Sequence, residues 1–166
     1  KIDLRTNAIS RIYLAPESML YSLTVIEDDL WAGSYSGQLI QLTRQLEVVN
    51  VFPSPFEEKN TSRMWVHCPR RVTDSLLYYG NRHGLIALDL STKRSHYVFE
   101  DKAAYWLHQD QRGDWWAGTS AGLFHLASGQ MYLDSIAGRP LRIEHIQEDA
   151  AGKFWLSTYA GLIKWE

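Results

Sequence analysis

The sequence predicts an all-β fold made of β-propeller blades. Helical periodicity is absent, and short apolar runs alternate with turns at the roughly 8–12-residue spacing of all-β proteins. A glycine-bearing hairpin also occurs four times, with anchoring aromatic residues at Trp31, Tyr78, Trp116 and Trp155. These anchors lie about forty residues apart, and a four-stranded unit of that period is typical of propeller blades.

The third copy shows the hairpin most clearly. Trp116 leads into Gly118, a short turn of small residues follows, and the chain leaves through Gly122 into another apolar run. A blade cannot bury both faces of its sheet alone, so we expect each anchoring aromatic ring to lie between two blades. We expect the glycine after it to allow a tight turn.

The blades can be assigned in order along the chain. Residues 1–14 are expected to end the third strand of one blade and supply its fourth, because they repeat the pattern of 87–99. Three blades are expected at 19–52, 63–99 and 103–133, and an incomplete one at 142–166. The expected strands are 21–27, 30–34, 38–42 and 47–52 in the first of these blades, and 64–68, 76–80, 85–88 and 95–99 in the second. They are 104–109, 115–118, 123–126 and 130–133 in the third, and 143–148, 154–157 and 162–165 in the incomplete one.

Two connections interrupt this regularity. A proline-bearing, charged loop at 53–62 accounts for the longer first spacing, and the first hairpin of the second blade carries extra residues at 69–74. The ends fit two arrangements. Residues 9–14 could pair with the edge near 162–165 and close a four-bladed ring, or the chain is part of a longer propeller. We favour the second arrangement because four blades is the lower limit for propellers.

Composition excludes several classes of protein. Lysine and arginine number 17 against 19 acidic residues, so there is no basic stripe for nucleic acid. No apolar run approaches the roughly 18 residues of a membrane span. The single cysteine, Cys68, cannot form an internal disulfide. The chain begins at Lys1 and reads as a processed or excised piece.

No catalytic, metal or cofactor motif stands out. The six histidines lack metal-ligand spacing, and the acidic turns lack the alternating carboxylates of a calcium loop. We interpret those turns as aspartate caps with glycine at positive φ. Ser34 and Ser36 do not form a nucleophile elbow, and Cys68 beside His67 points to the opposite face of a strand. We therefore expect no enzyme activity, cofactor or metal.

The loops between second and third strands, with the loops entering each first strand, should gather around one mouth of the channel. Aromatic planes there would stack on sugar rings, and guanidinium and amide groups would bind hydroxyls or carboxylates. The candidate ligand-binding residues are Tyr35, Arg63, Trp65, Asn81, Arg82, His83, Tyr105, Trp106, Ser120, Arg142 and Tyr159.

The repeat resembles the two-component regulator propeller family. The fourth copy, from Ile143 to Trp155, reads Ile-Glu-His-Ile-Gln-Glu-Asp-Ala-Ala-Gly-Lys-Phe-Trp, and the third, from Trp116 to Leu123, reads Trp-Ala-Gly-Thr-Ser-Ala-Gly-Leu. Ser157 and Tyr78 depart from the family's glycine and tryptophan. The resemblance implies seven-bladed propellers in the periplasm, joined through a membrane span to a signalling module, with oligosaccharides as the best-known ligands.

We therefore expect a periplasmic sensor segment of a bacterial signal-transduction receptor, without catalysis. Its expected partners are a small-molecule or oligosaccharide ligand, either a sugar or a uronate-bearing oligosaccharide, other blades or domains of the same receptor, and a second copy in a homodimer. One alternative is a lyase related to streptogramin lyases, with His83 or His145 as general base. The other is a protein-interaction scaffold, which would expose a large apolar patch.

Overall fold

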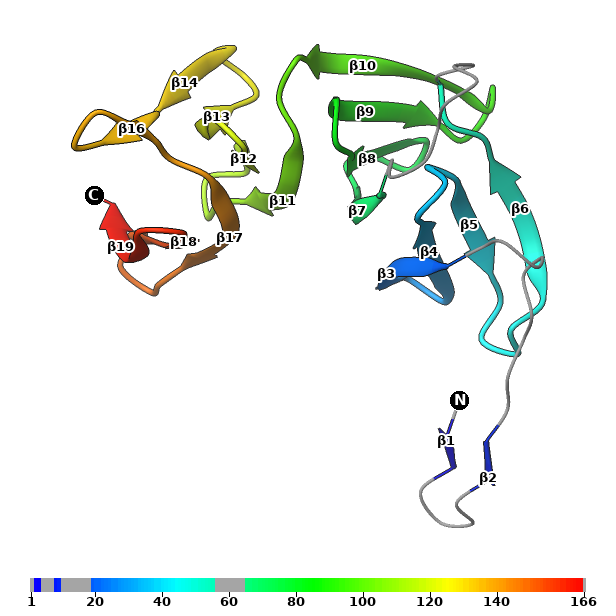
Figure 1. Ribbon diagram of the computed structural model, residues 1–166. Helices are drawn as coiled ribbons and strands as arrows, with labels where there is room; N and C mark the ends of the chain where they lie inside the picture. Colours follow the sequence, from blue (N-terminus) through cyan, green and yellow to red (C-terminus); the bar gives the residue numbers. More distant parts are fainter. Residues whose placement is uncertain (1, 4–7, 10–18, 56–64, 166) are drawn as a thin grey trace.

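The computed structural model describes residues 2–3, 8–9, 19–55 and 65–165, and the regular structure there consists of strands alone. Figure 1 shows four sheets side by side in an open arc, with one strand of each on the concave side. This arrangement confirms the predicted all-β class with propeller blades. Within the described part, no helix is long and apolar enough to cross a membrane.

Each blade is a meander of antiparallel strands that runs outward from the concave side. The strands are β3 (Leu20–Ile26), β4 (Asp29–Ser34), β5 (Leu39–Leu42) and β6 (Val48–Phe52) in the first blade; β7 (His67–Arg71), β8 (Leu76–Gly80), β9 (Gly84–Asp89) and β10 (Arg94–Glu100) in the second; β11 (Ala104–Gln109), β12 (Trp115–Thr119), β13 (Gly122–His125) and β14 (Gln130–Tyr132) in the third; and β17 (Ile143–Glu148), β18 (Phe154–Thr158) and β19 (Gly161–Trp165) in the fourth.

Two features differ from the sequence-based expectation. The first strand of the second blade was expected at 64–68, but β7 runs to Arg71 because a register shift between His67 and Arg70 accommodates Pro69. A short hairpin, β15 (Ser135–Ile136) and β16 (Arg139–Pro140), was also not expected. Its turn residues Ala137 and Gly138 both have positive φ, as a tight hairpin turn requires.

The N-terminal residues form a separate ladder. Strands β1 (Ile2–Asp3) and β2 (Ala8–Ile9) pair with each other in an antiparallel sheet. Residues 10–14, which one expected arrangement used to close a four-bladed ring, lie outside the described residues. Among the described strands, β19 pairs with β18 alone, and Figure 1 shows β1 and β2 apart from it.

The core lies between the blades. Trp31 is 1% exposed and stacks on Phe52 at a ring-centroid distance of 5.8 Å, in a cluster that includes Leu77 and Tyr79 of the next blade. Trp116 packs between the third and fourth blades, against Phe154 of the latter. Burying each large apolar side chain contributes about 1.5–3 kcal/mol. The expected position of these two anchoring rings between blades is confirmed.

The glycine that follows three of the four anchors has a different role from the expected one. Gly33, Gly80 and Gly118 lie within strands rather than in turns. A Cβ on Gly80 would lie 2.2 Å from the carbonyl oxygen of Ala104, and one on Gly33 would lie 2.5 Å from that of Val66. These glycines therefore let one blade approach the backbone of the next, and this contact brings the inner strands together at the channel.

Candidate ligand-binding site at the channel mouth

The innermost strand of every blade contains a register shift near the same end of the channel. The shifts lie between Leu20 and Ser22 in β3, His67 and Arg70 in β7, Ala104 and Trp106 in β11, and Ile143 and His145 in β17. This end also holds the loops between second and third strands. A bulge re-aims the side chain of its extra residue, and those residues include Tyr21, Tyr105 and Glu144.

Aromatic rings from the first two blades form a continuous group at this mouth. Tyr21 stacks on Trp65 with ring centroids 5.7 Å apart, and Tyr35 lies 6.3 Å from the same indole. The His67 ring meets Tyr21 edge-on at 4.9 Å and reaches Tyr105 of the third blade at 5.6 Å. Five rings thus connect three blades.

Arg142 extends this group to the fourth blade. Its guanidinium carbon lies 4.1 Å from the ring centroid of Tyr105 and 4.9 Å from that of Tyr159, and the guanidinium pairs with Glu144. Cation–π contacts of this kind hold a guanidinium over an aromatic face. We call the whole set the mouth row: Tyr21, Tyr35, Trp65, His67, Tyr105, Arg142, Glu144 and Tyr159.

Two buried ring nitrogen atoms in the mouth row have unused hydrogen-bonding capacity within the described residues. Nε1 of Trp65 and Nε2 of His67 have no hydrogen-bond partner among the described residues. Burial and, to a smaller extent, the nearby Arg142 charge lower the pKa of His67 from 6.5 to about 4. The imidazole is therefore neutral at pH 7, with one ring nitrogen that donates and one that accepts.

The structure brings together five of the residues proposed from sequence, namely Tyr35, Trp65, Tyr105, Arg142 and Tyr159. It also places Tyr21, His67 and Glu144 beside them, and sequence reasoning did not include these three in the site. A tyrosine at 21 and again at 105, each near the start of a first strand, was the available signal. The bulges that orient these side chains become visible only when the pairing of the strands is known.

The other proposed residues have different surroundings. Asn81 is 1% exposed, accepts hydrogen bonds from the backbone of His83 and Gly84, and donates to Tyr97, so it stabilises its turn. Ser120 accepts a hydrogen bond from the backbone of Ala103. The side chains of Arg82 and His83 are exposed. Burial, the larger effect, raises the pKa of Tyr105 in the mouth row, and the Arg82 charge nevertheless reaches this tyrosine and acts to lower that pKa.

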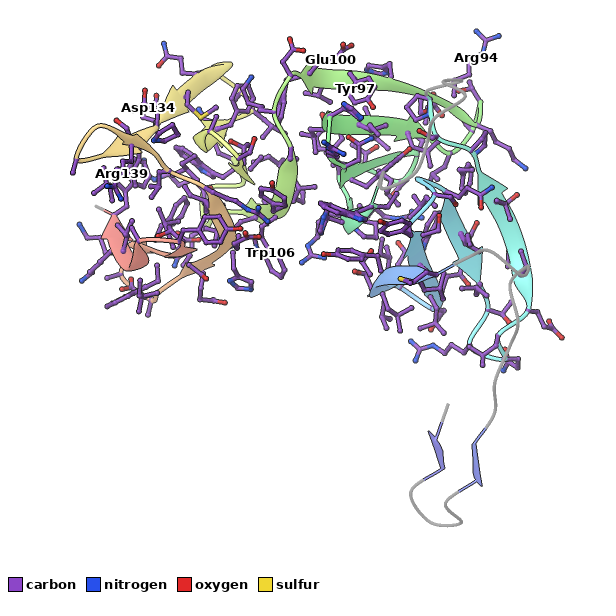
Figure 2. The ribbon with its side chains drawn as sticks, viewed as in Figure 1. Arg94, Tyr97, Glu100, Trp106, Asp134 and Arg139 are labelled. Atoms are coloured by element: carbon purple, nitrogen blue, oxygen red, sulfur yellow. The ribbon has the colours of Figure 1, made fainter. Side chains whose placement is uncertain are left out.

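Trp106 does not belong to the mouth row. It packs against His145 at a centroid distance of 3.8 Å and under the guanidinium of Arg70 at 5.1 Å. Figure 2 shows it on the concave side of the arc. Arg63 lies outside the described residues.

A hollow of about 570 Å³ lies between the third and fourth blades, beside the turns that follow β11 and β17. Its wall includes Trp116 and Trp165, whose rings pack against each other at 5.5 Å. Two half-buried carboxylates in its wall are already bonded: Asp110 to Trp116, and Glu148 to His108. Because these groups serve the blade interface, we place the candidate site at the mouth row instead. No group of three potential metal ligands occurs among the described residues.

Comparisons with known proteins establish the fold. No family model and no curated protein sequence matches the chain. Among solved structures, the chain resembles the extracellular domain of BT4673 from B. thetaiotaomicron, with a TM-score of 0.75, 20% identity, and coverage of 98% of this chain and 24% of that one. The chain also resembles the extracellular domain of BT3049 from the same organism, which is named as a hybrid two component system. That likeness has a TM-score of 0.70 and 19% identity, and it covers 99% of this chain and 24% of that one.

A virginiamycin B lyase from Staphylococcus aureus, in an inactive H270A form with quinupristin, gives a TM-score of 0.69 at 11% identity, covering 93% of this chain and 57% of that one. These likenesses confirm the propeller fold. The BT4673 and BT3049 domains come from proteins named as one- or two-component systems, the class of protein that the repeat resembles. The chain spans about a quarter of the length of the two extracellular domains.

Proposed function

We propose that this chain is a ligand-binding segment of an extracytoplasmic sensor propeller, and that it binds an oligosaccharide at the mouth row without chemical change. The mouth row carries the proposal, because it joins all four blades through ring and guanidinium contacts. The likeness to extracellular domains of signalling proteins supports the periplasmic location and the sensor role.

The chemistry of the mouth row suits a sugar. Sugar rings present C–H faces that pack on aromatic planes, and Tyr159 offers such a plane because it is 78% exposed. Sugar hydroxyls both donate and accept hydrogen bonds, which suits the Trp65 and His67 nitrogens, since these have no partner within the described part of the chain. A ligand touching two blades would favour one arrangement of them, which is the condition for transmitting a signal.

Another blade of the same receptor is the partner we propose for the outer face of the first blade. Leu23 and Val25 of β3 are 65% and 56% exposed. A hollow of about 320 Å³ beside them is lined by Leu23, Leu30, Arg44 and Leu46. The equivalent faces of the inner blades are buried between neighbours. This apolar face therefore fits a blade better than the separate protein partner that a scaffold would need.

The lyase alternative lacks support in the described geometry. A lyase needs a general base placed beside a matching acid. His145 is packed against Trp106, and burial, Arg70 and His108 together lower its pKa. The other proposed base, His83, is an exposed turn residue that is not part of the mouth row.

Thermal unfolding in the presence of an oligosaccharide panel tests the proposal. A ligand that binds only the native state raises the midpoint, so at least one oligosaccharide should do so. Tyr159→Ala should weaken its binding about tenfold in calorimetry, because an aromatic contact is worth about 1 kcal/mol or more. His96→Ala, an exposed change on the outer strand β10, is the control. If no oligosaccharide stabilises the protein, or if Tyr159→Ala binds normally, the proposal is wrong.

A further inference from the structure

Arg70, Trp106 and His145 form a second group just below the mouth row. Each is the first paired residue after the bulge of its inner strand. The Arg70 guanidinium lies 5.1 Å from the Trp106 ring centroid, and the His145 ring lies 3.8 Å from it. All three side chains are half-buried. Trp106 therefore holds a guanidinium and an imidazole close together on the concave side of the arc, where Figure 2 shows it.

The described residues do not balance the charge of this group. Among the described residues, no carboxylate lies within ion-pair distance of Arg70, whose only hydrogen bond within the described part goes from Nη1 to the adjacent Pro69 carbonyl at 3.2 Å. The nearby acids are engaged elsewhere: Glu144 with Arg142, and Glu148 with His108. Arg142 is thus paired with Glu144 of β17, whereas Arg70 has no carboxylate partner among the described residues.

We infer that Arg70 and His145 form an anion subsite, with Trp106 as the positioning residue, and that the ligand of this propeller is an oligosaccharide bearing an acidic group. A guanidinium binds a carboxylate or sulfate through paired N–H donors, and a charge-assisted bond of this type is about twice as strong as a neutral one. His145 adds a third donor. The inference rests on the proposed function for the sugar part of the ligand and deepens it by naming the charge.

A neutral sugar would leave this group unexplained. Hydroxyls gain little from a half-buried positive charge, whereas an anion gains from it in a site partly shielded from water. The exposed ring of Tyr159 in the mouth row can pack on the sugar, and the group below it can bind the acid. The geometry therefore divides one site into a sugar-binding part and an acid-binding part.

A matched pair of probes tests the inference. α-1,4-Trigalacturonate and its methyl ester differ in the carboxylate charge, so calorimetry should show the acid binding about tenfold more tightly. The preference should vanish in Arg70→Gln and persist in part in Arg70→Lys, which keeps the charge without the fork. Arg94→Gln removes the same charge from the outer rim, where Figure 2 shows Arg94, and should leave the preference intact.

A second readout does not depend on oligosaccharide affinity. In NMR titrations of histidine-labelled protein, D-glucuronate should raise the pKa of His145 by about half a unit, because a bound anion offsets the Arg70 charge. Methyl D-glucuronate should leave that pKa unchanged. The groups that face His145 are Arg70 on β7, and Trp106 and His108 on β11.

The outcomes separate this inference from the proposed function. Equal binding of acid and ester, a preference that survives Arg70→Gln, or a His145 ring that does not respond to glucuronate would overturn the anion subsite. If neutral oligosaccharides still bind in a Tyr159-dependent manner, the sensor proposal stands alone. An Arg70-dependent response to glucuronate without any oligosaccharide binding would support the anion subsite and contradict the proposed oligosaccharide binding.

Discussion

The Asp110 carboxylate accepts a hydrogen bond of 3.0 Å from the indole nitrogen of Trp116. The same carboxylate accepts backbone N–H groups of Arg112 and Asp114, and Gly113 closes the turn at a φ of +90°. In the fourth blade, Asp149 makes the same set of bonds, including one of 3.1 Å to Trp155. The Asp-x-x-Gly spacing of the repeat thus ties the turn to the anchoring ring.

Replacing Asp110 with alanine should destabilise the protein by about 1–2 kcal/mol, because three donors lose their acceptor at once. Urea unfolding monitored by tryptophan fluorescence would measure this. Asp28→Ala removes a carboxylate whose side chain is 99% exposed, and should change stability by less than about 0.5 kcal/mol. Equal effects of the two substitutions would show that the bond to Trp116 is not stabilising.

Gly80 provides a test of blade packing. Gly80→Ala would place a Cβ 2.2 Å from the backbone oxygen of Ala104, so the blades must move apart, and we expect a loss of about 1–3 kcal/mol or more in urea unfolding. Ser157 occupies the matching position of the fourth blade and is exposed. Ser157→Ala should therefore be nearly neutral. A neutral Gly80→Ala would contradict the close approach of the two blades.

The blades were predictable because the repeat specifies them locally. An aromatic ring such as Trp116, a strand glycine and a hairpin glycine recur in order. Each of them makes its contacts within its own blade or with the next blade. The role of Gly118 was harder to predict: the residue type indicated a turn, but the constraint comes from Ile143 of the neighbouring blade, 2.9 Å from where its Cβ would lie.

The candidate site was only partly predictable. Tyr35 and Tyr159 lie in loops that any propeller brings to one mouth, so topology was enough to group them. Tyr21 and Glu144 need the bulges, which insert an extra residue into a strand and are visible only in the pairing. Asn81 is a residue type that often binds ligands, but its side-chain oxygen accepts hydrogen bonds from the backbone of its own turn. The residue type alone does not determine which of these two roles it has.

Stability should depend on the protonation of His67. Its pKa is about 4 in the folded protein and 6.5 when unperturbed, so the unfolded state binds more protons between these values. Stability should therefore be full above pH 6.5 and fall as the pH is lowered toward 4. His67→Gln should make urea unfolding less dependent on pH in this window. His96→Gln, at an exposed position, should keep the wild-type dependence; an unchanged slope in His67→Gln would mean that His67 is not buried as described.

Arg142 should contribute directly to the low pKa of His67. Burial is the larger cause and the Arg142 charge the second, so Arg142→Gln should raise the pKa of His67 by about half a unit without restoring 6.5. An NMR titration of the imidazole signals would measure this. Arg139→Gln removes a charge from the adjacent β16 and should leave the His67 pKa unchanged. If Arg142→Gln does not move that pKa, the guanidinium is not held over Tyr105 in solution, and the mouth row does not extend to the fourth blade.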